Sequence, residues 1–250
     1  MRGLRLLVAI LAGTVAAFAS GAAPAADTNV AVAANFTEPA KEIARLFESR
    51  TGHKAILSFG ATGQFYVQIS QAAPFQVFLS ADQSTAKKLV DDGLAVADSL
   101  FTYAVGKIVL FSTDAGLVKG EQTLRDAPFN KIAIANPETA PYGTAAVEAM
   151  KSLGIYDKLA GRIVQGSNIS QAFQFVDTGN AEIGFVALSQ VIGRPGGSRW
   201  IVPANLYTPI RQDAVLLNNG AGNPAARDFI AFLKGPDAAA VIERFGYATK

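Results

Sequence analysis

The sequence contains no cysteine and only one histidine, His53, among its 250 residues. Without cysteine the chain can form no disulfide, carry no lipid on a thiol and offer no thiolate nucleophile. A single histidine does not make a metal cluster, so we expect no direct metal ligands. His53 lies in TGHK, a turn between a predicted helix and a predicted strand, and we expect it to be solvent-exposed and without a role.

Common catalytic and nucleotide-binding motifs are also missing. The chain has no G-x-S-x-G elbow, no Walker loop and no G-x-G-x-x-G fingerprint. The stretch GRPGGS (193–198) is rich in glycine but lacks the spacing and the lysine of a phosphate loop, so we interpret it as a surface loop. No cofactor is therefore expected.

The only long apolar run is at the N-terminus. Arg2 and Arg5 precede an apolar run over 6–19, and the small residues GAAPAAD follow. This pattern is typical of a secretory signal peptide cleaved near Ala25 or Ala26, and the run is too short for a comfortable membrane span. We expect residues 1–26 to be removed, which leaves a soluble protein, most simply in a Gram-negative periplasm.

Charge is balanced, which limits the classes of partner. The chain has 22 Lys+Arg and 20 Asp+Glu. The predicted signal peptide carries two arginines and no acid, so the mature chain would hold 20 residues of each sign. This balance gives no basis for binding nucleic acid or anionic lipid.

What the sequence does contain is an alternation of strand and helix patterns. TNVAVAA (28–34) predicts a buried strand, and the apolar spacing that follows, from Phe36 to Phe47, predicts one face of a helix. Further strand–helix pairs predict an α/β protein with mostly parallel sheets flanked by helices. The long run AVGKIVLFS (104–112) and the segment 209–213 are the best candidates for two strands that cross between lobes. We therefore expect residues 27–104 plus 210–250 in lobe 1, and residues 105–209 in lobe 2, which suits a hinged clamp.

Four places share one design, in which a strand ends, small polar residues follow and a helix starts: AANFT (33–37), FGATG (59–63), NPETAPYG (136–143) and QGSNIS (165–170). Helix starts carry unsatisfied N–H groups and partial positive charge, so several of them aimed at one point can bind an anion. The simpler interpretation is that each polar residue is an ordinary helix cap. Glu38 and Glu138 lie in two of these loops, where a carboxylate would repel a dianion. For Glu38 we favour a solvent-facing position in the first turn of a helix.

The order of these segments resembles the periplasmic molybdate-binding proteins, which are the substrate-capturing subunits of molybdate ABC transporters. The resemblance extends over about residues 28 to 250 and rests on VAVAANFTEPAKEIARLFESRTGHK, SFGATGQFYVQI, PFQVFLSADQ, NPETAPYG, EIGFVALSQV, PIRQDAVLL and FLKGPDAA…FGY. It implies a two-lobed periplasmic-binding fold, type II-like, that closes on a tetrahedral oxyanion held by neutral hydrogen bonds. Molybdate, and by the same chemistry tungstate, would bind as an intact ion through its oxygens. The implied partner is a membrane ABC permease, and we expect a monomer by analogy.

The resemblance also implies the donors. In lobe 1 they would be Asn35, through its backbone and as an open question its side chain, and Thr62, through its hydroxyl and backbone N–H. Thr62 would thus be both cap and ligand. In lobe 2 they would be the backbone at Tyr142 and at Ile169. Four loop residues would support them: Gly60, Ala61, Gly63 and Asn168.

This chain departs from part of the family. One branch has serine at the position of Asn35 and a tyrosine hydroxyl near Ala187, where this chain has no hydroxyl to offer. Ala61 also replaces a common serine. Another branch has asparagine and tyrosine at the positions of Asn35 and Tyr142, which makes the Tyr142 hydroxyl the candidate replacement.

Three alternatives remain open at the level of the sequence. The same architecture could bind sulfate, thiosulfate or phosphate, and phosphate would require a carboxylate acceptor such as Glu138. A small secreted α/β enzyme acting on an anionic substrate would need a general base, for which these loops offer only Glu38 and Glu138. A binding subunit that feeds a sensor in place of a permease would have the same sequence features.

Overall fold

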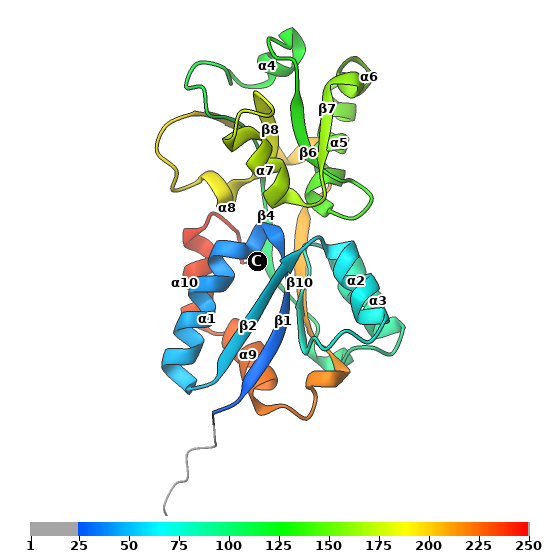
Figure 1. Ribbon diagram of the computed structural model, residues 1–250, viewed down its shortest axis with the longest axis vertical. Helices are drawn as coiled ribbons and strands as arrows, with labels where there is room; N and C mark the ends of the chain where they lie inside the picture. Colours follow the sequence, from blue (N-terminus) through cyan, green and yellow to red (C-terminus); the bar gives the residue numbers. More distant parts are fainter. Residues whose placement is uncertain (1–24, 250) are drawn as a thin grey trace, which may run out of the picture.

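The computed structural model describes residues 25–249 and contains two five-stranded sheets, one in each of two lobes (Figure 1). We call the part built on the sheet β2-β1-β3-β10-β4 lobe 1 and the part built on β7-β6-β8-β5-β9 lobe 2. The strands of lobe 1 are β1 Asp27–Ala33, β2 Lys54–Gly60, β3 Val77–Leu79, β4 Phe101–Gly106 and β10 Ile210–Leu216. Those of lobe 2 are β5 Ile108–Ser112, β6 Ile132–Ala135, β7 Ile163–Gly166, β8 Ile183–Ala187 and β9 Ser198–Ile201.

The pairing of the strands confirms the prediction of mostly parallel sheets. In lobe 1, β1 runs parallel to β2 and β3, and β10 runs antiparallel to β3 and β4. In lobe 2, β6 runs parallel to β7 and β8, and β5 runs antiparallel to β8 and β9. In each sheet a single strand, β10 or β5, therefore opposes the direction of the other four.

Helices connect the parallel strands and cover the sheets. In lobe 1 they are η1 Ala34–Phe36, α1 Thr37–Thr51, α2 Thr62–Ser70, α3 Gln83–Asp91, η2 Ala97–Ser99, η5 Asn218–Gly220, α9 Pro224–Leu233 and α10 Pro236–Arg244. In lobe 2 they are α4 Glu121–Asp126, α5 Pro141–Ser152, α6 Tyr156–Leu159, η3 Ala160–Arg162, α7 Ile169–Asp177 and α8 Leu188–Val191. The short helix η4 Ala204–Leu206 precedes the return to lobe 1. Within residues 25–249 no helix is long and apolar enough to cross a membrane.

Alternation along β1 explains how its sheet is covered on both faces. Val30 and Val32 belong to the cluster that contains side chains of α1, α9 and α10. Ala31, which points to the opposite face, packs with Phe65 of α2 and Leu89 of α3. Because side chains alternate across a strand, one short apolar run supplies both layers of the lobe 1 core.

The lobes are joined where strands pass directly from one sheet to the other. Only Lys107 separates β4 from β5, and β10 begins at Ile210 after the chain leaves lobe 2. The C-terminal segment lies at the same junction, where Ala248 pairs with Val105 of β4 (Figure 1). The ladder between β4 and β10 skips Tyr103, which makes it the extra residue of a β-bulge opposite Gln212 and Asp213.

The expectation for His53 is wrong. The side chain is buried, with 4% of its surface exposed. Its Nδ1 accepts a hydrogen bond from the Ala26 N–H at 3.0 Å, and its Nε2 lies 3.3 Å from Asp228 Oδ2. The turn residue is covered because the segment before β1 and helix α9 both pack against it, contacts that its own neighbours in the sequence do not reveal. Residues 1–24 of the predicted signal peptide lie outside the described residues.

Close approach between α5 and β6 leads to a first prediction. A Cβ added to Gly143 would lie 2.2 Å from the Ala135 carbonyl oxygen, a backbone atom that cannot move aside. We expect Gly143→Ala to lower the free energy of unfolding by about 2 kcal/mol or more, because overpacking outweighs the better helix propensity of alanine. The measurement is urea unfolding followed by circular dichroism.

Gly161→Ala is the matched control, since an added Cβ there meets nothing within 4 Å. Equal stability of the two variants would contradict the packing that places the start of α5.

Candidate functional site

A small, partly open hollow lies between the lobes, at the ends of strands from both sheets. The space for the centre of a water-sized sphere is about 10 Å³, close to what a single water molecule needs, so the hollow is a compact site and not an extended groove. None of its lining side chains carries a charge: Ala33, Ala34, Asn35, Gly60, Thr62, Ala81, Ala140, Pro141, Tyr142, Asn168 and Ile169. A hollow of this kind can hold a guest by directed hydrogen bonds but not by opposite charge.

The structure brings most of the predicted site residues together here. Asn35, Thr62, Tyr142 and Ile169 all line the hollow, and each exposes 3% or less of its surface. The supporting residues Gly60 and Asn168 line it as well. The other two supporting residues, Ala61 and Gly63, do not line the hollow. Ala61 is buried at the position before α2, and Gly63 lines a neighbouring hollow, where its N–H donates to the Thr139 carbonyl of lobe 2 at 2.9 Å.

Three of the helices that start at the hollow have no side-chain cap. The cap positions of η1, α2 and α5 are Ala33, Ala61 and Ala140, and none of them makes a side-chain hydrogen bond to its helix. The first amides of a helix have no partner within the helix. A buried start without a cap leaves these N–H groups to be satisfied from outside, and the hollow is where a guest could do so.

Thr62 illustrates the point and corrects one prediction. It is the first residue of α2 and not its cap, so the predicted capping role is wrong. Its Oγ1 accepts a hydrogen bond from the Ala81 N–H at 3.0 Å. Among the described residues the hydroxyl donates to no protein acceptor, which leaves its proton available beside the backbone N–H of the same residue.

Helix α7 is the capped exception. Asn168 Oδ1 accepts from the N–H groups of Ser170 at 2.9 Å and Gln171 at 3.1 Å. This cap serves the second and third amides of the helix and leaves out the first, that of Ile169. The side chain of Asn168 is thus a true cap, and the Ile169 amide remains for a guest.

A buried polar network lies beside the hollow, and most of it could not be predicted from the sequence. The Asn35 side-chain amide donates to Gln212 Oε1 at 2.8 Å and to the Tyr247 hydroxyl at 3.0 Å. The Tyr142 hydroxyl accepts from Gln212 Nε2 at 3.1 Å and lies 3.5 Å from Asn35 Nδ2. Tyr103 donates to Gln212 Oε1 and to the Ser80 carbonyl, both at 3.0 Å. The one available signal was Gln212, a polar residue within the apolar strand QDAVLL.

The pKa values of the three tyrosines in this network are raised strongly, which favours the neutral form of each side chain. Burial raises the pKa of Tyr247 to about 12. Burial, together with the neighbouring Tyr247, raises the pKa of Tyr103 and of Tyr142 well above the ordinary value of 10. All three hydroxyls therefore keep their protons at neutral pH and serve as fixed hydrogen-bonding groups.

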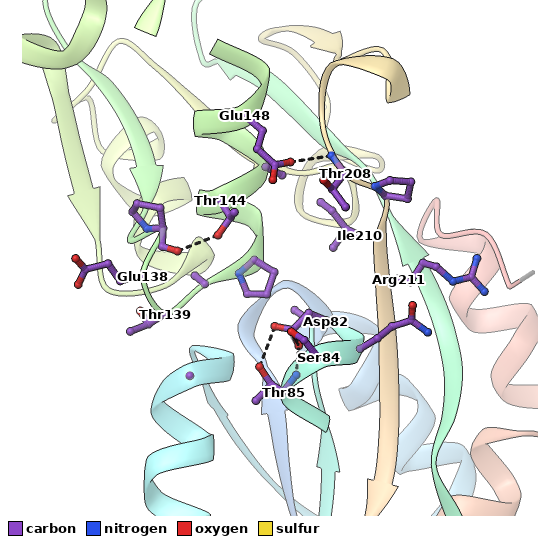
Figure 2. A pocket seen from close by; sticks show the side chains of 18 residues that line it. Asp82, Ser84, Thr85, Glu138, Thr139, Thr144, Glu148, Thr208, Ile210 and Arg211 are labelled. Carbon is purple, nitrogen blue, oxygen red and sulfur yellow. Dashed lines mark hydrogen bonds between the residues drawn. The ribbon is translucent and has the colours of Figure 1, made fainter. Parts of the chain in front are cut away.

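Carboxylates lie around the hollow and not in it. A larger groove of about 370 Å³ adjoins it and shares Ala81, Ala140 and Pro141. Figure 2 shows Asp82, Glu138, Glu148 and Arg211 along this groove, with Glu138 turned away from its centre. Glu38 is exposed in the first turn of α1, as predicted, and it also pairs with Lys41. Within residues 25–249 no group of three or more acidic or histidine side chains could hold a metal ion.

The fold and the hollow define a class of protein. Two lobes with helix starts from both of them at a hollow lined by uncharged residues are the features of a two-lobed binding protein for a small anion. Residues 28–248 match the family described as bacterial extracellular solute-binding protein. The chain belongs to this family.

Several known proteins are similar to this chain in sequence or in structure over most of its length. The chain is 54% identical over 228 residues to the molybdate-binding protein ModA of Rhodobacter capsulatus, covering 91% of this chain and 90% of that protein. It is 54% identical over 247 residues to ModA of Azotobacter vinelandii, covering 97% and 96%. The solved structure of the Azotobacter vinelandii periplasmic molybdate-binding protein superposes with a TM-score of 0.86 at 40% sequence identity, covering 89% of this chain and 99% of that one.

The raised pKa values predict instability at alkaline pH. An unfolded chain loses its phenolic protons near pH 10, whereas folded Tyr247 keeps its proton until about pH 12. The unfolded state then binds fewer protons than the folded state, so the free energy of unfolding falls as pH rises above 10. For Tyr247 alone the full loss is about 3 kcal/mol.

Urea unfolding between pH 8 and 11.5 measures this slope. Tyr247→Phe should flatten it, even though the variant starts from a lower stability. An unchanged slope in that variant would show that Tyr247 does not keep its proton through burial in the network.

Proposed function

We propose that the chain captures molybdate, and tungstate by the same chemistry, between its lobes and delivers it to a membrane ABC permease. The observation that carries this proposal is the neutral hollow, where the amides of Asn35, Thr62, Tyr142 and Ile169 and the hydroxyl of Thr62 gather from both lobes. Fixed dipoles of this kind can hold a dianion without a counter-charge. The identity to proteins named for molybdate binding supports this choice of ion.

The surroundings of the hollow disfavour the alternatives. Hydrogen phosphate carries a proton that needs a carboxylate acceptor, and Glu138 and Glu38 both lie outside the hollow. Sulfate is a fully ionised rival of the same shape, and only binding experiments separate it from molybdate. The lining offers no carboxylate, imidazole or thiol to act as a general base, which supports a role in binding and not in catalysis.

We also propose where the chain is located and how its lobes move. Cleavage near Ala25 or Ala26 would release the chain into a periplasm as a monomer. We place lobe 1 at residues 27–104 plus 210–250 and lobe 2 at 105–209, with hinge movement about the crossings near Lys107 and Pro209. The short connection at Lys107 supports a division close to this one, because β4 ends at Gly106 and β4 and β5 belong to different sheets.

Thermal unfolding with molybdate, tungstate, sulfate, thiosulfate and phosphate in turn tests the choice of ion. A ligand at a hundred times its Kd adds about 2.7 kcal/mol, which should raise Tm by roughly 5 to 10 °C in a chain of this size. We expect this rise with molybdate and tungstate alone. A rise in Tm with sulfate or phosphate in place of molybdate would support an anion-binding protein of this fold but reject molybdate as its ligand. No rise in Tm with any of the five ions would reject the proposal.

Thr62 provides the test of the site. Thr62→Val keeps the shape and removes the hydroxyl, so one hydrogen bond to a charged guest is lost and affinity for molybdate should fall about tenfold to a hundredfold by calorimetry. Thr62→Ser keeps the hydroxyl and should bind nearly as wild type does.

Thr178→Val, at the exposed end of α7, controls for the substitution itself. Since Thr62 also accepts from Ala81, the Tm of each ligand-free variant is measured alongside. Wild-type affinity in a folded Thr62→Val variant would remove Thr62 from the donor set.

A further inference from the structure

The backbone carbonyl of Asn35 is held by a ring of hydrogen bonds outside the hollow. Ser189 Oγ and the Tyr247 hydroxyl each lie 2.8 Å from this carbonyl oxygen, and they lie 2.9 Å from each other. The ring closes on Asn35 itself, whose side-chain Nδ2 donates to the Tyr247 hydroxyl at 3.0 Å. All three residues are buried, exposing 3 to 8% of their surface. Buried polar groups of this kind are costly without partners, so the ring is a built feature.

The ring and Gln212 together account for both protons of the Asn35 side-chain amide. One points to Tyr247, and Gln212 Oε1 takes the other at 2.8 Å. A guest in the hollow can therefore use the backbone N–H of Asn35 but not its side chain. The side chain instead sets the position of the peptide that carries the donor.

The ring also spans the two lobes. Asn35 belongs to η1 of lobe 1, and Ser189 belongs to α8 of lobe 2. Tyr247 comes from the C-terminal segment, which pairs with the crossing strand β4 through Val105 and Ala248. The segment is pressed against α8 as well, because a Cβ added to Gly246 would lie 2.8 Å from Leu188 Cδ2. Because Asn35 and Ser189 belong to different lobes, separation of the lobes at this point would break the Ser189 bonds.

We propose that Ser189 and Tyr247 form a closure latch that acts on the ion through Asn35, as positioning residues that do not touch it. Neither residue lines the hollow. Tyr247 holds the Asn35 peptide whether the lobes are open or closed, since both lie in lobe 1. Ser189 adds its bonds only on closure and so raises the population of the closed state, which in turn raises the apparent affinity. This inference rests on the proposed function, because it assigns roles around the same hollow.

The two residues predict different kinetic effects. Ser189→Ala should weaken molybdate binding about threefold to tenfold, the effect of one buried hydrogen bond. Release should become faster with little change in the rate of association, because the open lobe meets the ion with its donors intact. Tyr247→Phe should weaken binding similarly and also lower the Tm of the ligand-free chain. The double variant should lose less than the sum of the two, because both act on the same carbonyl.

Stopped-flow kinetics and a distance measurement test the latch together. The chain has no native cysteine, so Gln71→Cys on lobe 1 and Asp157→Cys on lobe 2, both exposed, can carry a fluorophore pair for energy transfer. The distance is recorded without ligand and with saturating molybdate. We expect Ser189→Ala to shift the population toward the open distance and to leave the ligand-free Tm unchanged. Ser152→Ala and Tyr66→Phe are controls, since their hydroxyls bond within one lobe.

The outcomes separate the latch from the function. Molybdate release and lobe distances in Ser189→Ala that equal those of wild type would overturn the latch and leave molybdate capture intact. A wild-type chain that does not bind molybdate would overturn the proposed function. In that case the ligand-free distances still decide the latch, which stands if Ser189→Ala opens the lobes and falls if it does not.

Discussion

Buried helix starts without caps are the constraint on which the site depends. The helices η1, α2 and α5 have alanine at their cap positions and no side-chain cap. In an exposed loop, water would satisfy their first amides. Asn35, Thr62 and Tyr142 lie in the first turns of these helices and expose 3% or less of their surface, so we propose a ligand with several acceptor oxygens as the partner of their amides. A tetrahedral oxyanion has acceptor oxygens in all directions and could meet donors from both lobes.

The use of neutral donors has a consequence for closure. A charged clamp would attract the ion over a distance, whereas fixed amides act only when they surround it. Under the proposed function, binding would be coupled to closure of the lobes, and contacts between the lobes would add to the affinity. The inter-lobe bonds from Gly63 to Thr139 and from Ser170 to the Ala34 carbonyl belong to this set, as do those of Ser189.

Rigid support behind the donors completes the arrangement. The bulge at Tyr103 and the buried amide of Gln212 bring the crossing strands into the same network as Asn35 and Tyr142. The tyrosine hydroxyls stay neutral because burial raises their pKa values, so the network presents no negative charge to an anion. The candidate role of the Tyr142 hydroxyl as a substitute ligand stays a prediction, because accepting a hydrogen bond from Gln212 Nε2 does not use the proton of that hydroxyl.

The local pattern of the sequence determined the strand and helix alternation, the four helix starts and the absence of charge among the predicted donors. These features follow from periodicity and from residue type over short stretches, and the four loops could be placed at the ends of strands because parallel strands end together. The choice of Asn35, Thr62, Tyr142 and Ile169 within these loops came from the resemblance to the family. Only the tertiary structure decided which polar atoms are already in use. Thr62 is not a cap because Ala81 binds its hydroxyl, and His53 is buried because Ala26 and Asp228 reach it. The ring of Asn35, Ser189 and Tyr247 joins residues 154 and 212 positions apart, a distance over which side-chain pattern carries no information about contact.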